Sequence, residues 1–248
     1  MSAGEQRLVT IANVGMLNFG PGALLRCAGD LIAQQRQSVF VVTTEPTLFL
    51  CRPLIDALEA SDVGCTLWYE LAGEPTFAEF GHALAAARRC GADAVVGLGG
   101  GSAMDVAKLV AALIDGRQQI AEVIGTDLLA GRSTWLACVP TTAGTGSEVT
   151  PIAILGDEDE DLKKGVVSRF LVPDAAYLDP ALTVTMPPAV TAATGLDALT
   201  HCIEAYANRF AHPLVEQQAL GPDGRGAPLG LIRIARCDEA NAAKAATA

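Results

Sequence analysis

The stretch Asp93-Ala94-Val95-Val96-Gly97-Leu98-Gly99-Gly100-Gly101-Ser102 decides the fold, because an apolar run passes through three glycines into the helical pattern of residues 103–114. Such a run predicts a strand that is buried on both faces of a parallel sheet. Glycines between strand and helix let backbone N–H groups approach an anion, and the helix start adds partial positive charge. The stretch therefore predicts a phosphate-binding turn with Ser102 as N-cap, although a plain strand-to-helix turn has the same appearance.

Strand-like and helix-like segments alternate on both sides of this turn. The predicted strands are residues 38–43, 66–69, 93–98 and 135–139, and the predicted helices are residues 23–35, 48–60, 77–90 and 103–114. This order predicts an α/β fold with a parallel sheet that is covered by helices on both faces.

The helical pattern of residues 189–210 contains no strand, and it marks a change in the chain. We therefore expect two parts, an α/β domain in residues 1–184 and a helical region in residues 185–248. The cluster Gly221-Pro222-Asp223-Gly224-Arg225-Gly226 is expected to end any helix, and an alanine-rich tail follows it. The helical region is accordingly expected to be incomplete, with an atypical tail.

The composition limits the classes of partner. Half of the 248 residues are hydrophobic, 18% are charged, and the net charge is −11. This charge argues against nucleic acid and anionic membranes as partners, and no apolar run reaches the roughly 20 residues of a membrane span. The seven cysteines form no CxxC pair. Because no signal peptide is recognisable, we expect a reduced, cytoplasmic protein.

Two further polar groups in the sequence are candidates for a binding site. The loop 140–148 follows a predicted strand and is rich in threonine and glycine. Ligands bind at this end of strands in open α/β sheets, although a polar connector has a similar composition. Asp105 and Lys108 lie three residues apart in the helix after the glycines. One interpretation is a solvent-exposed ion pair. The other is that Asp105 lies in the first turn of the helix and faces the ligand.

Asp197 and His201 are four residues apart on a predicted helix. This spacing places a carboxylate and an imidazole on one face, where both can bind one cation, but it also suits an ordinary surface pair. Two ligands rarely hold a catalytic metal. His212 is the remaining histidine after His201, and Pro213 is expected to end that helix directly after it.

Four segments together resemble the iron-containing (group III) alcohol dehydrogenase family. They are residues 99–108, 139–150, 177–180 and 186–206, and the similarity spans roughly residues 8–216. The resemblance implies a parallel-sheet nucleotide-binding domain followed by an all-helical domain, the dehydroquinate synthase-like architecture. It implies cofactor binding by Gly99, Gly100, Gly101, Ser102, Asp105, Thr141, Thr142, Thr145 and Lys163, and metal binding by Asp197 and His201, which would act in catalysis through the metal.

The resemblance also implies a reaction. A bound Fe²⁺ or Zn²⁺ lowers the pKa of an alcohol, and a hydride then passes to NAD or NADP; in reverse, an aldehyde is reduced. Members that prefer NAD usually carry an acidic residue at the end of the second strand. Thr44 aligns with that position and Glu45 follows it, so the choice between NAD and NADP stays open.

The family's two remaining metal ligands are downstream histidines that this sequence lacks. We therefore expect weak metal binding and an activity reduced or lost by truncation. A lyase resembling dehydroquinate synthase and a non-catalytic nucleotide-binding fragment stay open as alternatives. Without later helices to pack on it, residues 189–210 are expected to expose apolar surface, which favours self-association into a homo-oligomer.

Overall fold

A six-stranded parallel sheet forms the centre of the computed structural model, which describes residues 12–158 and 160–207. The strand order is β1-β9-β6-β4-β2-β3, and all pairs are parallel. The strands are β1 (Met16–Phe19), β2 (Ser38–Val42), β3 (Gly64–Trp68), β4 (Ala94–Gly99), β6 (Trp135–Pro140) and β9 (Ala175–Leu178). The predicted parallel α/β sheet is therefore confirmed.

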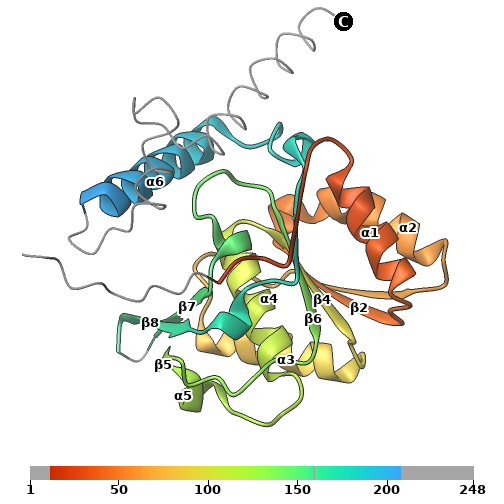
Figure 1. Ribbon diagram of the computed structural model, residues 1–248, viewed down its shortest axis with the longest axis horizontal. Coiled ribbons are helices and arrows are strands. Elements are labelled where there is room, and N and C mark those ends of the chain that lie inside the picture. The colour runs from red at the N-terminus through yellow and green to blue at the C-terminus, as the bar shows by residue number, and fades with distance from the viewer. Residues whose placement is uncertain (1–11, 159, 208–248) are drawn as a thin grey trace, which may run out of the picture.

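Helices cover both faces of this sheet (Figure 1). The main helices are α1 (Ala23–Ala33), α2 (Arg52–Glu59), α3 (Phe77–Arg89), α4 (Gly101–Leu113), α5 (Ile120–Val123) and α6 (Pro188–Ala207). In β2, Phe40 and Val42 pack with α3 and α4, whereas Val39 and Val41 pack with α1 and α2. Because successive strand residues point to opposite faces, a continuous apolar run is what two covered faces require.

Four short 3₁₀ helices complete the helical elements of the described residues: η1 (Glu45–Cys51), η2 (Ser147–Val149), η3 (Arg169–Leu171) and η4 (Pro180–Leu182). The prediction of one helix over residues 48–60 was wrong in its first part, because residues 48–51 belong to η1. Pro53 lies in the first turn of α2, where its missing N–H costs no helical hydrogen bond, so a new helix starts there.

A second sheet, which the sequence did not predict, has the strand order β5-β8-β7. Its strands are β5 (Gly125–Thr126), β7 (Ile152–Asp157) and β8 (Leu162–Val167), and β7 and β8 form an antiparallel hairpin. The outer edge of β7 is covered. Ile154 N donates to the Asp105 carboxylate at 3.0 Å, and Gly156 N donates to Pro75 O at 2.8 Å. The hairpin is therefore held against α4 and against the loop before α3.

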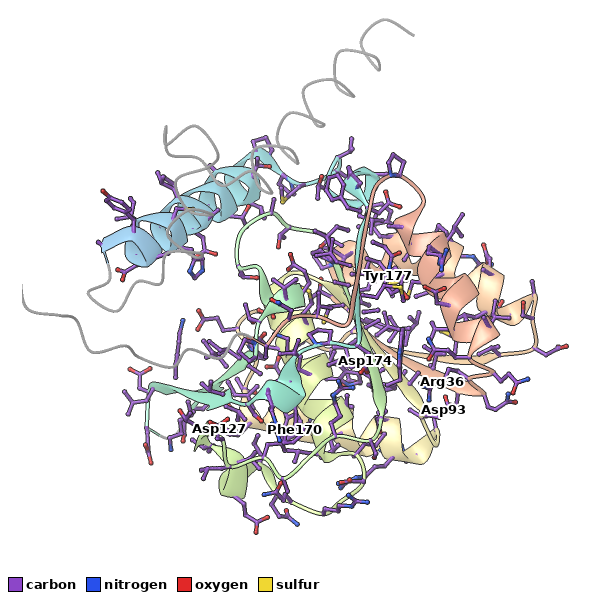
Figure 2. All side chains as sticks on the ribbon, viewed as in Figure 1. Arg36, Asp93, Asp127, Phe170, Asp174 and Tyr177 are labelled. Carbon is purple, nitrogen blue, oxygen red and sulfur yellow. The ribbon has the colours of Figure 1, made fainter. Side chains whose placement is uncertain are left out.

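The segment Tyr177–Pro180 ties the sheet to α1. The hydroxyl of Tyr177 donates to Asp30 in α1 at 2.8 Å, and Tyr177 lies beside that helix in Figure 2. The carboxylate of Asp179 accepts hydrogen bonds from Gly22 N at 2.9 Å and Leu24 N at 3.3 Å. Asp179 thus caps the start of α1. The segment 177–180, one of the four that resemble the family, therefore stabilises the packing of α1 on the sheet.

Helix α6 contains most of the predicted helix 189–210, whose last residues, 208–210, lie outside the described residues. None of the helices within residues 12–158 and 160–207 combines the length and the apolar character that a membrane crossing needs.

Candidate functional site

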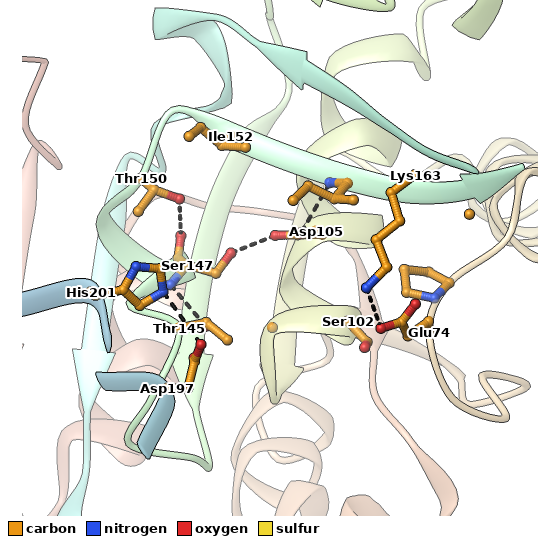
Figure 3. A pocket seen from close by; sticks show the side chains of 14 residues that line it. Glu74, Ser102, Asp105, Thr145, Ser147, Thr150, Ile152, Lys163, Asp197 and His201 are labelled. Carbon is orange, nitrogen blue, oxygen red and sulfur yellow. Dashed lines mark hydrogen bonds and ion pairs between the residues drawn. The ribbon is translucent and has the colours of Figure 1, made fainter. Parts of the chain in front are cut away.

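A cavity of about 450 Å³ lies where α4, the polar loop, the β7–β8 hairpin and α6 meet (Figure 3). It is lined by Gly101, Ser102 and Asp105 from α4, Thr145, Ser147 and Thr150 from the loop and η2, Ile152, Ile154, Gly156 and Lys163 from the hairpin, Glu74 and Pro75 from the loop before α3, and Asp197 and His201 from α6. The glycine turn and the carboxylate–imidazole pair, about 100 residues apart in the sequence, therefore face one cavity.

The glycine turn leaves the start of α4 open. The N-cap is Gly100, without a side-chain hydrogen bond, so the prediction of Ser102 as N-cap was wrong. The first helical hydrogen bond joins Met104 N to Gly100 O at 3.2 Å. The N–H groups of residues 101–103 thus precede the helical hydrogen-bond ladder. Because no side chain caps them, they are suited to an anionic ligand.

Threonines of the polar loop pack directly on the glycines. A Cβ added to Gly101 would lie 2.9 Å from Thr145 Cγ2, and one added to Gly100 would lie 3.5 Å from Thr142 Cγ2. Thr141 is buried, and its N–H donates to Gly99 O at 3.0 Å. Gly99, Gly100, Thr141 and Thr142 therefore stand behind the cavity wall, whereas Gly101, Ser102, Asp105, Thr145 and Lys163 of the predicted cofactor residues line it.

Asp105 and Lys108 do not form the solvent-exposed ion pair that one interpretation predicted. Helix α4 begins at Gly101, so Asp105 lies just beyond the first turn, and the Lys108 side chain is 0% exposed. Asp105 Oδ1 accepts a hydrogen bond from Ser147 Oγ at 2.6 Å and lies 3.6 Å from Lys108 Nζ. The carboxylate thus faces the cavity while it holds the hairpin and η2.

Burial dominates the electrostatics of this pair. It raises the pKa of Asp105 above its ordinary value, and the nearby Lys108 ammonium opposes that change. Burial likewise lowers the pKa of Lys108, and the Asp105 carboxylate opposes the change. Each charge therefore offsets part of the other's desolvation cost, which makes the pair mutually dependent.

Lys163, on β8, lines the cavity at its more exposed side. Its Nζ lies 2.5 Å from Glu74 Oε1, and both side chains are more than half exposed. Glu74 and Pro75 were not predicted as site residues. They reach the cavity because Gly156 bridges to Thr76 and Pro75, a long-range contact that leaves no local signal in the sequence.

Asp197 and His201 point into the cavity from α6, as Figure 3 shows. Asp197 Oδ1 and His201 Nε2 lie 3.6 Å apart, and the side chains are 43% and 61% exposed. Helix α6 approaches the polar loop closely at Gly144, where an added Cβ would lie 2.9 Å from Thr194 Cβ. Because Asp197 and His201 form this close pair and both line the cavity, the prediction that they share one helix face is confirmed.

Within residues 12–158 and 160–207, no group of three or more His, Cys, Asp or Glu side chains is placed to hold a metal ion. His212, the remaining histidine after His201, lies outside these residues.

The opposite face of α6 is apolar and exposed, as predicted for this segment. It carries Leu196, Leu199, Ile203 and Tyr206, each at least half exposed, whereas Ala198 is the buried residue of the helix. Small residues thus face the part of the chain built around the six-stranded sheet, which we call the sheet domain, and the bulky apolar residues face away from it.

Comparison with known proteins shows a family of dehydrogenases to which the sequence of this chain is similar. Residues 15–180 match the family model described as iron-containing alcohol dehydrogenase. A sulfoacetaldehyde reductase from Bilophila wadsworthia is 36% identical over 200 residues, which cover 79% of this chain and 51% of that protein. A probable alcohol dehydrogenase, EutG, from Salmonella typhimurium is 36% identical over 218 residues, covering 87% of this chain and 55% of that protein.

Solved structures agree. An alcohol dehydrogenase from Oenococcus oeni superposes with a TM-score of 0.81 at 26% identity, covering 85% of this chain and 56% of that one. The sulfoacetaldehyde reductase from Bifidobacterium kashiwanohense, solved in complex with NAD⁺, has a TM-score of 0.71 at 31% identity, covering 81% and 54%. The chain spans about half the length of these curated relatives.

Proposed function

Because this chain belongs to the iron-containing alcohol dehydrogenase family, we propose that it binds NAD or NADP in the cavity and transfers a hydride between that cofactor and an alcohol or aldehyde. The same proposal assigns nucleotide binding to residues 1–184 and metal binding to the helical region 185–248. The observation that carries it is the shared cavity, which has the open start of α4 on one side and Asp197 with His201 on the other.

The residues of the glycine turn are proposed to bind the cofactor's pyrophosphate. The N–H groups of residues 101–103 precede the helical ladder, and a helix start with free donors favours phosphate oxygens. Gly99 and Gly100, with Thr141 and Thr142 behind them, set the path of the turn, whereas Thr145 and Ser102 line the cavity beside it. Lys163, which pairs with Glu74 in this structure, is proposed to contact the ribose with its ammonium group when the cofactor binds. Asp105 lines the same cavity.

Asp197 and His201 fit two positions around a divalent cation. An oxygen and a nitrogen donor lie 3.6 Å apart at the cavity surface, and this donor set suits Fe²⁺ and Zn²⁺ alike. When bound, such an ion would supply Lewis-acid polarisation of the alcohol or carbonyl oxygen. The pair's part is to hold the ion on the side of the cavity opposite the glycine turn.

A second candidate, nucleotide binding without turnover, is favoured by one observation. The described residues offer the cation two ligands and no third, whereas catalytic zinc sites usually have three protein ligands. Binding of the cofactor needs neither ligand, because the glycine turn and the polar loop belong to the sheet domain.

A titration of the full chain with NADH and NADPH, followed by cofactor fluorescence, tests the proposal. A matched pair of variants localises the site. Gly101→Ala places a Cβ 2.9 Å from Thr145 in the cavity wall, whereas Gly29→Ala, in α1, meets nothing within 4 Å. We expect Gly101→Ala to weaken binding about tenfold, or about 1.4 kcal/mol, and Gly29→Ala to leave it unchanged.

An alcohol-oxidation assay with added Fe²⁺ or Zn²⁺ separates the two candidates. Turnover supports the dehydrogenase, and binding without turnover supports the second candidate. Equal affinity of Gly101→Ala and the unsubstituted chain would place the cofactor elsewhere, and the absence of binding by either dinucleotide would refute both candidates.

A further inference from the structure

Lys108 is a buried cation that joins three elements without lining the cavity. Its Nζ donates to Ser147 Oγ at 2.7 Å, Thr150 Oγ1 at 3.1 Å and Ile152 O at 2.8 Å. An ammonium has three protons, so these three acceptors use all of them. A buried ammonium is costly unless its hydrogen bonds are satisfied, and an apolar side chain of similar volume usually packs at lower cost. Burial alone therefore does not account for a lysine at this position.

The partners of Lys108 line the cavity. Ser147, Thr150 and Ile152 all contribute to its wall, as does Asp105. Because Ser147 Oγ accepts a hydrogen bond from Lys108, its own proton is directed to Asp105 Oδ1, at 2.6 Å. The second oxygen of Asp105 accepts from Ile154 N at 3.0 Å. One buried ammonium thus sets the orientation of a hydroxyl, a carboxylate and the first residues of β7.

We propose that Lys108 is a positioning residue for the dinucleotide site. Its ammonium holds residues 147–154 against α4 so that the Ser147 and Thr150 hydroxyls and the Asp105 carboxylate form a fixed wall for the cofactor. The effect on cofactor affinity rests on the proposed function. The effect on residues 147–154 does not, because it concerns contacts within the chain.

Lys108→Met keeps an unbranched apolar side chain, one heavy atom shorter than that of lysine, and removes all three hydrogen bonds. Arg132→Met is the matched control. The Arg132 side chain is 9% exposed and donates to the carbonyls of Phe170, Thr134 and Val172 and to Asp174. These partners lie outside the cavity lining. Both variants therefore lose a buried cation with several acceptors. Of the two cations, Lys108 is the one whose partners form the cavity wall.

Hydrogen exchange of the full chain, at a temperature where each variant is folded, tests the positioning. We expect the N–H groups of residues 147–150 and 152–154, and that of Ile154 above all, to exchange at least about tenfold faster in Lys108→Met, because a buried network is lost as a unit. In Arg132→Met their exchange is expected to match that of the unsubstituted chain. Unchanged exchange of these amides in Lys108→Met would overturn the proposal.

Cofactor titration tests the consequence. The Kd for NADH is expected to rise about tenfold or more in Lys108→Met and to change less than twofold in Arg132→Met. In the double variant with Ser147→Ala, the two losses are expected to be less than additive, because Lys108 acts through Ser147. Full additivity, or an unchanged Kd in Lys108→Met, would also overturn the proposal.

Two further outcomes remain decisive. If the unsubstituted chain binds no dinucleotide, the proposed function fails, and hydrogen exchange alone decides whether Lys108 holds the wall. If Lys108→Met does not fold, Ser147→Ala combined with Thr150→Val removes both side-chain acceptors and keeps the lysine. Faster exchange of residues 147–154 is then expected, and unchanged exchange would refute the role of these contacts.

Discussion

The sheet-domain wall of the cavity and the α6 wall differ in how firmly each is held. Gly101 and Asp105 follow a buried strand, and Asp105 is fixed by hydrogen bonds from Ser147 and Ile154. Helix α6, by contrast, buries Ala198 and leaves its bulky apolar residues exposed. The wall that is proposed to bind the cofactor is thus built independently of α6.

The comparison separates the two halves of the proposed chemistry. Cofactor binding draws on residues whose positions are determined by the core, whereas metal binding draws on two side chains of a helix with little packing support. Binding sites lose affinity when their residues must be ordered on binding. We therefore expect this chain to bind a dinucleotide more readily than a cation.

The largest expected difference between the two regions is in packing. Leu98→Ala, in β4, truncates a fully buried side chain, whereas Leu199→Ala, on α6, truncates one that is 50% exposed. We expect Leu98→Ala to lower the free energy of unfolding by about 2–5 kcal/mol and Leu199→Ala to change it by less than about 0.5 kcal/mol. Urea denaturation followed by circular dichroism measures both. Similar losses would show that α6 is packed as tightly as the core.

The next effect is a loss of stability at alkaline pH. Burial raises the pKa of the Cys65 thiol from 9.0 to about 11 and that of the Cys138 thiol to about 12. Between pH 9.0 and the raised pKa of each thiol, the folded chain keeps a thiol proton that the unfolded chain releases. The stabilisation is therefore complete below pH 9.0 and is lost as the pH rises through 11 and 12. The free energy of unfolding is expected to fall by up to about 1.4 kcal/mol per pH unit for each thiol.

Denaturation at a series of pH values from 8 to 11 measures this slope. Cys138→Ala removes the fully buried one of these two thiols and is expected to flatten the slope above pH 9, although it lowers stability at every pH. A slope that is the same with and without Cys138 would contradict the assignment of the effect to the core.

The smallest expected effect on stability is at the α6 pair. His201→Ala is expected to change the free energy of unfolding by less than about 0.5 kcal/mol, because exposed pairs contribute little. Its effect on metal binding is expected to be complete. Zn²⁺ bound weakly by the unsubstituted chain, measured by equilibrium dialysis, is lost in His201→Ala and retained in His82→Ala, which changes an exposed histidine of α3. One tightly held ion per chain would contradict the expectation of weak binding.

Local patterns in the sequence predicted much of the fold. The apolar runs and the glycine turn predicted β2, β4, β6 and the start of α4 to within a few residues, because periodicity and turn chemistry act over short distances. They did not predict the β7–β8 hairpin, whose edge is held by Asp105, 49 residues from Ile154. The spacing of Asp197 and His201 likewise predicted a shared helix face, but not the cavity that this face meets.

By itself, then, the sequence determined four strands of the main sheet with the helices beside them, the position of the glycine turn and the donor pair on α6, since each depends on residues a few positions apart. The tertiary structure decided that Lys108 is buried beneath Ser147, 39 residues away, and that α6 turns its small residues inward and its bulky ones outward. Burial depends on which segments pack together, and chain segments that are distant in sequence determine it.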